Sequence, residues 1–191
     1  MSCTRCRLSA GRTQVVWASG RDDAELMFIG EGPGYHEDRQ GLPFVGAAGQ
    51  LLDRLLGEIG LRRDDVYVCN TVKCRPPGNR DPLPDELEAC KPYLDAQVRM
   101  VDPNVIVTLG NFATRYVLNR PVAISRVRGQ KNIVDGRVVI PTFHPAAVLR
   151  GGGDASRQMQ ALREDFATIK ATLQEMAERG GPPVEEQLGL F

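Results

Sequence analysis

The sequence lacks any long hydrophobic run and any excess of charge. No stretch of its 191 residues approaches the ~18–20 apolar residues that a membrane-spanning helix needs. Its first ten residues also lack the apolar segment of a secretion signal. Its 24 basic and 24 acidic side chains cancel, which disfavours a protein that holds nucleic acid through bulk positive charge. We therefore expect a cytoplasmic protein without a membrane partner.

Histidine is scarce, with two residues, and cysteine is present in an odd number, five. Cys3 and Cys6 form a C-x2-C pair, and fifteen residues separate Cys74 from Cys90. An odd count without an export signal argues against a disulfide framework. Four thiolates suit either tetrahedral zinc or an iron–sulfur cluster, and their spacing leaves both open. Cys69, inside a strand-like segment, is interpreted as a small buried hydrophobic residue.

Strand-like and helix-like segments alternate along the chain. The expected strands are residues 24–29, 66–72, 104–109 and 137–143, and the expected helices are residues 47–59, 81–101, 111–118 and 155–178. This alternation predicts an α/β protein, with a three-layer α/β/α arrangement around a central, mainly parallel sheet of four strands. Asp135-Gly136 predicts a hairpin turn between residues 124–134 and the last strand. We expect one domain over residues 1–178 and a flexible tail over residues 179–191.

Polar and glycine-rich segments follow these strands, where ligands of parallel sheets bind. Gly30-Glu-Gly-Pro-Gly34 lacks the third glycine of a dinucleotide fingerprint, and its Pro33 has no amide donor, so a nicotinamide site is disfavoured. The turn does allow a flat ligand to approach the backbone closely. Its alternative interpretation is a tight turn with no ligand.

Two further residues have both a functional and a structural interpretation. Phe44 lies in a loop rich in glycine and proline, where an aromatic ring either stacks on a base or anchors the loop. His144 follows a strand and precedes Pro145, which places it at the mouth of the sheet as a hydrogen-bond donor or as a structural histidine. Basic residues at the strand ends form either a phosphate track or a solvated surface.

Five motifs together resemble the family 4 uracil-DNA glycosylases, the iron–sulfur branch of that superfamily. They occur in the family's order from Cys3 to about Arg150, with the four spaced cysteines. The motifs are Gly30-Glu-Gly-Pro-Gly34 with Glu37-Asp38, Gly41-Leu-Pro-Phe-Val-Gly46, Asn70-Thr-Val-Lys-Cys-Arg-Pro-Pro77, Asn79-Arg-Asp-Pro82 and His144-Pro-Ala-Ala-Val-Leu-Arg150.

The resemblance implies an enzyme that hydrolyses the N-glycosidic bond of flipped-out deoxyuridine, releasing uracil and leaving an abasic site for base excision repair. His144 would donate to uracil O2, Asn70 would read O4 and N3–H, and Phe44 would stack on the base. Either Glu31 or Glu37 would orient water, and Glu37 would alternatively exclude the thymine methyl. The residues implied to line the uracil pocket are Glu31, Gly32, Pro33, Phe44, Asn70 and His144.

The sequence departs from the superfamily at Gly32, where its best-known members have an aspartate general base. Catalysis would then depend on stabilising the leaving group. The alternative function is a non-catalytic iron–sulfur module that binds uracil-containing or abasic DNA. The short segment at residues 38–41 lacks the basic insertion of relatives that bind covalently, which favours turnover.

The resemblance also implies a cofactor and a DNA surface. Cys3, Cys6, Cys74 and Cys90 would hold a [4Fe–4S] cluster. Leu149 would act as a wedge in the minor groove and Arg150 as a phosphate contact. The residues implied to contact DNA are Lys73, Arg75, Arg80, Leu149 and Arg150. We expect a monomer associated with the nucleoid.

The end of the chain carries a separate motif. Gln187-Leu-Gly-Leu-Phe191 resembles the pentapeptide by which bacterial repair and replication proteins bind the sliding clamp. Gln187 would bond at the edge of the clamp pocket, while Leu188, Leu190 and Phe191 would fill its apolar part. The simpler interpretation is a loose terminus.

Overall fold

The computed structural model describes residues 3–179 and contains one six-stranded sheet. The expected clamp-binding peptide at residues 187–191 lies outside the described residues. In sheet order the strands are β1 (Ser19–Gly20), β3 (Tyr67–Asn70), β2 (Leu26–Gly30), β4 (Val105–Leu109), β6 (Arg137–Thr142) and β5 (Asn132–Val134).

The α/β class is confirmed, but the expected number of four strands is wrong. The four central strands β3, β2, β4 and β6 are parallel, and β1 and β5 pair antiparallel at the two edges. Strands of two and three residues are too short to show the periodicity by which strands are recognised. The turn at Asp135-Gly136 is confirmed, since both residues have positive φ between the paired β5 and β6.

Seven helices occur in the described range, and three of them were not expected. The unexpected helices, α1, α5 and α6, have only four to six residues. The bounds are α1 (Tyr35–Gln40), α2 (Ala47–Glu58), α3 (Pro84–Val101), α4 (Gly110–Leu118), α5 (Ile124–Val127), α6 (Pro145–Arg150) and α7 (Arg157–Arg179). Four short 3-10 turns are η1 (Arg7–Ala10), η2 (Arg63–Asp65), η3 (Pro77–Asn79) and η4 (Gly153–Ala155).

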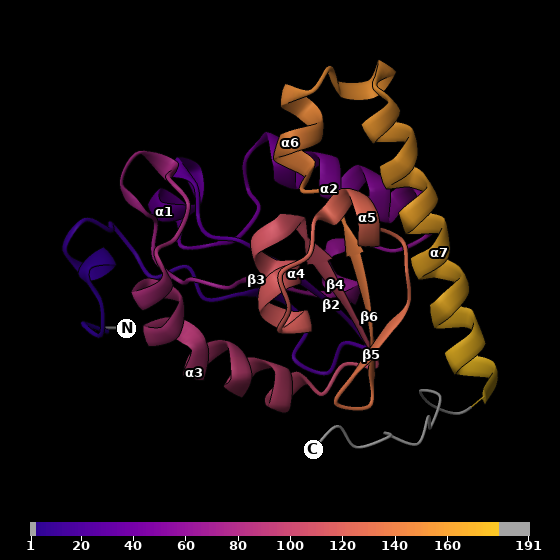
Figure 1. Cartoon of the computed structure of the whole chain (residues 1–191), viewed down its shortest axis with the longest axis horizontal. Coiled ribbons are helices and arrows are strands. Elements are labelled where there is room, and N and C mark those ends of the chain that lie inside the picture. Colours follow the sequence, from indigo (N-terminus) through magenta and orange to yellow (C-terminus); the bar gives the residue numbers. More distant parts are fainter. Residues whose placement is uncertain (1–2, 180–191) are drawn as a thin grey trace.

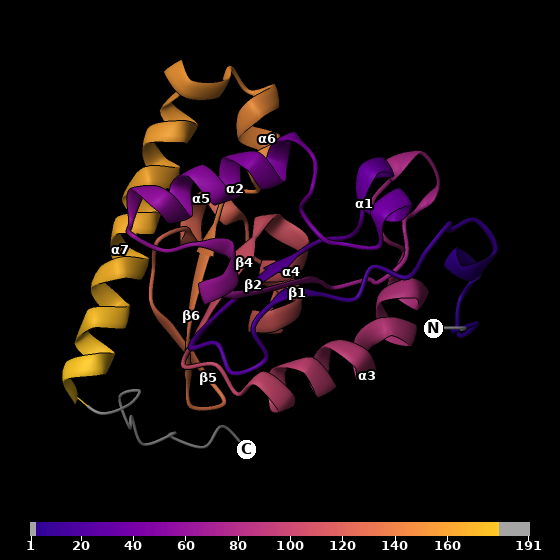
Figure 2. The ribbon, with the colours of Figure 1, turned by 180° about the vertical axis from the view of Figure 1, so that it is seen from behind.

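Helices cover both faces of the sheet (Figures 1 and 2). On one face, Phe28 of β2 packs with Leu52 of α2 and Phe166 of α7. On the other face, Met27 packs with Leu94 of α3 and Ala113 of α4. Neighbouring residues of β2 thus enter opposite cores, as the strand pleat requires. No helix within residues 3–179 is long and apolar enough to cross a membrane.

The order of the strands determines where the loops that follow them meet. From β2 the chain passes to β3 on one side, and the connection through α3 then crosses to β4 on the other side of β2. Such a switch in direction opens a crevice beyond the carboxyl ends of the strands. The loops after β2, β3, β4 and β6 therefore meet there.

Candidate active site and cysteine cavity

A pocket of about 710 Å³ lies at the carboxyl edge of the parallel strands. Glu31 follows β2, Asn70 ends β3 and His144 follows β6, and all three line this pocket. Phe44, from the loop between α1 and α2, also lines it. The fold therefore brings together residues that are dispersed over most of the chain.

The side-chain amide of Asn70 has an unusual environment. Both Nδ2 and Oδ1 are buried, and neither has a hydrogen-bond partner within residues 3–179. Gly30 lies beside the amide, because a Cβ at that position would stand 2.4 Å from Oδ1. A buried amide without partners costs about 1–3 kcal/mol. An amide kept in this state beside a pocket is suited to a ligand that offers one acceptor and one donor.

His144 caps helix α6 and faces the same pocket. Its Nδ1 accepts a hydrogen bond from the Ala146 backbone N–H at 3.1 Å, which leaves the ring proton on Nε2. Burial, followed by the positive charge of Arg150, lowers the pKa of His144 to about 4. The imidazole is therefore a neutral donor at physiological pH.

Phe44 has a left-handed backbone, with φ of 55°, in a loop held by charged side chains. Arg63 Nη2 donates to the Phe44 carbonyl at 3.1 Å. Glu37 Oε1 accepts from the backbone N–H groups of Val45 at 3.0 Å and Gly46 at 3.1 Å. These bonds hold a conformation that a bulky residue otherwise avoids.

Glu31 is another titratable group in the pocket. Burial raises its pKa to about 7, the negative charge of Asp81 adds to the increase, and Arg150 opposes it. The backbone around Glu31 is fixed, because its carbonyl accepts from the Thr71 hydroxyl at 2.5 Å and the Val72 N–H at 3.2 Å. Glu31 thus changes charge near neutral pH while its backbone stays in place.

A second cavity, of about 480 Å³, lies between the N-terminal segment and α3. Cys3, Cys6, Cys74 and Cys90 all line it. Ser9 orders the first cysteine turn, because its hydroxyl donates to the Cys6 carbonyl at 2.9 Å. The N-terminal cysteine pair therefore shares one cavity with two thiols that are distant from it in sequence.

Three of these sulfurs accept hydrogen bonds of 3.3 Å. The donors are Arg12 Nη1 to Cys74, the Lys73 backbone N–H to Cys90, and the Tyr93 hydroxyl to Cys3. Burial raises the pKa of the Cys74 and Cys90 thiols. In the part of the chain that the structure describes, no set of three or more His, Cys, Asp or Glu side chains is arranged to hold a single metal ion.

Most of the chain matches one known protein family. Residues 18–167 match the family model described as the uracil DNA glycosylase superfamily. The chain belongs to the uracil DNA glycosylase superfamily. The matched residues include the four parallel strands and every residue that lines the candidate pocket.

Named relatives define the branch of the superfamily. A type-4 uracil-DNA glycosylase of Thermotoga maritima is 47% identical over 88% of both chains. Another from Sulfurisphaera tokodaii is 45% identical over 89% of this chain and 80% of the relative. A third from Archaeoglobus fulgidus is 50% identical over 78% of this chain and 79% of the relative. The chain is therefore a member of the type-4 branch.

The candidate pocket contains every residue that the resemblance assigned to uracil. The structure places Glu31, Gly32, Pro33, Phe44, Asn70 and His144 on its wall. Glu37 also lines the pocket, but one of its carboxylate oxygens is bonded to the loop that carries Phe44. Glu37 therefore has a positioning contact that the sequence did not reveal.

Four of the five residues expected to contact DNA lie near the surface. Leu149 and Arg150 are exposed on α6, and Arg75 is half-buried with its Nε bonded to Asn79 at 2.7 Å. Arg80 forms a 2.6 Å ion pair with the buried Glu86, which leaves its guanidinium partly exposed.

Lys73 is the exception. It is 2% exposed, and its Nζ donates to the backbone carbonyl of Asn70 at 2.5 Å and to Gln97 Oε1. Burial lowers the pKa of Lys73. The expected contact between Lys73 and a DNA phosphate is therefore not available in this fold.

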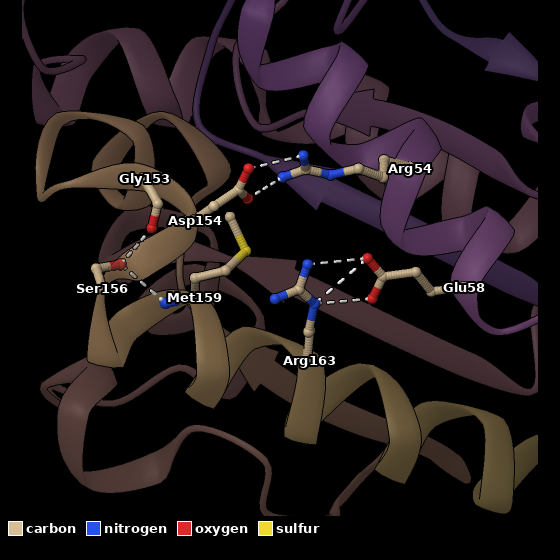
Figure 3. A network of polar contacts seen from close by, with 7 residues as sticks. All are labelled: Arg54, Glu58, Gly153, Asp154, Ser156, Met159 and Arg163. Carbon is tan, nitrogen blue, oxygen red and sulfur yellow. Dashed lines mark hydrogen bonds and ion pairs between the residues drawn. The ribbon is translucent and has the colours of Figure 1, made fainter.

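The segment after Leu149 and Arg150 is tied to α2 (Figure 3). Asp154 of η4 accepts from Arg54 Nη1 at 3.1 Å, and Glu58 accepts from Arg163 Nε of α7 at 3.0 Å. Ser156 Oγ accepts from the Met159 N–H at 3.1 Å and so supports the start of α7 (Figure 3). These contacts fix the turn that follows α6.

The sequence did not reveal the supporting contacts of Asp38, Arg63 and Arg12 around the two cavities. Asp38 is buried and accepts from the Thr13 N–H at 2.9 Å, which joins α1 to the segment after the first cysteines. Arg63 holds Phe44, and Arg12 faces Cys74. The motif Glu37-Asp38 marked one of these residues, but no pattern in the sequence distinguished Arg12 or Arg63 from surface arginines.

Proposed function

We propose that this chain hydrolyses the N-glycosidic bond of deoxyuridine in DNA, releasing uracil and leaving an abasic site for base excision repair. The observation that carries the proposal is the unpartnered amide of Asn70 in the pocket that also holds neutral His144. Membership of the type-4 branch supports the same reaction. All the proposed site residues come from one chain, so a monomer suffices.

Asn70 would select uracil through the N–H and the oxygen of its side-chain amide. The amide N–H donates to uracil O4 and the amide oxygen accepts from N3–H. Cytosine presents the opposite pattern there and would leave both buried groups unpaired, which such a site rejects strongly. Phe44 would stack on the base, and Gly32 and Pro33 would line the base's edge.

Departure of the base leaves negative charge on uracil and an oxocarbenium-like sugar. His144 Nε2–H would donate to O2, where negative charge develops, and a preorganised donor of this kind is worth ~3–4 kcal/mol. Because Glu37 is already bonded to the Phe44 loop, Glu31 is the carboxylate better placed to orient the water that attacks the sugar. Gly32 has no side chain that could act as a general base.

The target nucleotide must leave the duplex before it enters the pocket, at a cost of a few kcal/mol that is smallest in mispaired or single-stranded DNA. Exposed Leu149 would fill the gap in the base stack. Arg75, Arg80 and Arg150, near the pocket, would contact phosphates. A local basic rim is compatible with the zero net charge of the chain.

The cysteine cavity fits a [4Fe–4S] cluster held by Cys3, Cys6, Cys74 and Cys90. A single zinc ion would need all four sulfurs at ~2.3 Å from one point, whereas a cluster distributes them over four irons around a shared cavity. The three hydrogen bonds to sulfur and the nearby Arg12 suit the negative charge of cluster thiolates. When bound, the cluster supplies a cross-link between the N-terminal segment and the β3–α3 region.

The reaction is tested with a uracil-containing oligonucleotide that is incubated with the protein and then cleaved by alkali. Strand cleavage at the uracil, and none at cytosine or thymine in matched oligonucleotides, is the expected result. His144→Ala and Asn70→Ala serve as site controls, and Lys170→Met, an exposed residue of α7, serves as the surface control. Binding of uracil DNA with no alkali-labile product would support the non-catalytic module instead.

The remaining proposals concern organisation and partners. The catalytic domain would extend over residues 1–178, and the enzyme would act on DNA in the nucleoid of the cytoplasm.

The peptide formed by Gln187, Leu188, Leu190 and Phe191 would bind the bacterial sliding clamp. Its deletion is expected to abolish clamp binding without changing excision from short oligonucleotides. Equal clamp affinity of the truncated and full-length proteins would refute the clamp proposal.

A further inference from the structure

Lys73 lines the cysteine cavity and also contacts Asn70, which lines the candidate pocket. Its backbone N–H donates to Cys90 Sγ at 3.3 Å, and its Nζ donates to the Asn70 carbonyl at 2.5 Å. Residues 70–74 thus form a short bridge, with the base-reading residue at one end and Cys74 at the other. The bridge is buried throughout, from Asn70 to Cys74.

The Asn70 carbonyl needs this donor because the sheet ends beside it. On that side of β3, strand β1 pairs only with Val68 and Tyr67. Lys73 Nζ takes the place of a strand neighbour, and it lies 5.7 Å from the centre of the Trp17 ring. A buried backbone carbonyl without any donor would be costly.

Gln97 of α3 provides a second acceptor for Lys73 Nζ. Its Oε1 accepts from Lys73 Nζ, while its Nε2 donates to the Tyr67 hydroxyl at 3.0 Å and to the Trp17 carbonyl at 3.2 Å. Gln97 is itself fully buried. Lys73 therefore has a single position, set by α3 and by the strand that it supports.

We propose that Lys73 is a positioning residue that holds the backbone of Asn70, and thereby its unpartnered amide, in register with the base. This inference rests on the proposed function, since it assigns Asn70 to uracil. The amide has no side-chain partner within the described residues, so its placement depends on the backbone and on packing against Gly30. A misplacement of about 1 Å in such a site can cost roughly 10²-fold in rate.

The test compares Lys73→Met with Lys170→Met in the cluster-loaded protein. Lys73→Met is expected to lower the single-turnover excision of uracil by about 10- to 100-fold and to weaken the binding of free uracil. Iron content and visible absorption should stay unchanged, because the backbone N–H to Cys90 remains. Lys170→Met should behave as the parent protein.

A double-mutant cycle shows whether Lys73 acts through Asn70. Lys73→Met added to Asn70→Ala should cause little further loss, because the amide that it positions is already absent. Full additivity of the two losses would overturn the inference, as would an unaffected Lys73→Met. Gln97→Leu provides a second route if Lys73→Met fails to fold, and it should show the same non-additivity. If Asn70→Ala itself excises uracil normally, the proposed function fails rather than this inference alone.

Discussion

The ring of Phe44 stacks on the imidazole of His144, with centroids 5.6 Å apart and planes inclined by 25°. The contact joins the loop before α2 to the start of α6, two segments that are distant in the sequence. It excludes water from one face of the imidazole. The stack therefore links the residue proposed to hold the base to the residue proposed to stabilise the leaving group.

Phe44→Ala should raise the pKa of His144 from about 4 toward its ordinary value of 6.5, because burial is the main cause of the shift. NMR titration of the imidazole resonances would measure the change. His36, the other histidine, is exposed and provides an internal reference. An unchanged His144 titration in the variant would show that the stack does not cause the lowered pKa.

The same pKa of His144 predicts how stability varies with pH. The folded state resists protonation, whereas the unfolded chain takes up the proton near pH 6.5. The contribution of His144 to stability is therefore present above pH 6.5 and is lost as pH falls toward 4. His144→Gln should flatten the stability curve in this window, as measured by denaturant unfolding at several pH values.

Asn70→Ala should separate activity from stability. Excision of uracil is expected to fall at least about 10²-fold, since a donor to the reacting base is lost. The free energy of unfolding should not decrease by more than about 1 kcal/mol, because neither amide atom has a hydrogen-bond partner within residues 3–179. Thermal unfolding and single-turnover assays measure the two effects.

Asn70→Asp should gain activity on cytosine, because a carboxylate accepts from the exocyclic amine.

Glu31→Gln should stabilise the protein most at high pH. Burial and the charge of Asp81 raise the pKa of Glu31 from 4.5 to about 7, so the folded state loses stability as pH rises from 4.5 through 7. The glutamine carries no charge and removes this loss. Stability measured at pH 5 and pH 8 tests the prediction, with Glu25→Gln on an exposed position as the control. An equal effect of the two variants at pH 8 would contradict it.

The purified protein should be brown and contain four iron atoms per chain when isolated without oxygen, as a [4Fe–4S] cluster requires. Cys74→Ser is expected to lose the visible absorption and part of the thermal stability, because cluster binding contributes to folding. Cys69→Ser, at a cysteine buried outside the cavity, should retain the colour. A colourless protein with stoichiometric zinc would refute the cluster.

Asp154→Asn should weaken the action on duplex DNA more than it weakens the fold. The Arg54–Asp154 pair is exposed, and such pairs contribute about 0–1 kcal/mol to stability. Its loss would remove one of the contacts that tie the segment after Leu149 and Arg150 to α2 (Figure 3). Glu175→Gln breaks the similarly exposed Lys131–Glu175 pair, which lies away from the pocket. Equal excision by both variants on duplex and single-stranded substrates would contradict this role.

Patterns in the sequence were enough to predict the parallel core and the edge of the sheet where the site lies. Largely apolar runs such as residues 105–109 form strands because both of their faces are buried. Asn70 and His144 could be assigned to one edge because parallel strands end on the same side. The short edge strands could not be recognised, since two or three residues carry no period.

Which side chains face the solvent, and which face one another, depends on the packing of separate elements and could not be predicted from the sequence. Lys73 looks like a surface cation in the sequence, yet it is buried because α3 brings Gln97 to it and the sheet edge leaves the Asn70 carbonyl without a strand partner. Phe44 stacks on His144, and Arg12 faces Cys74, through contacts between distant segments. Periodicity fixes the orientation of a residue within its own element, whereas the partner of a buried polar group depends on how separate elements pack together.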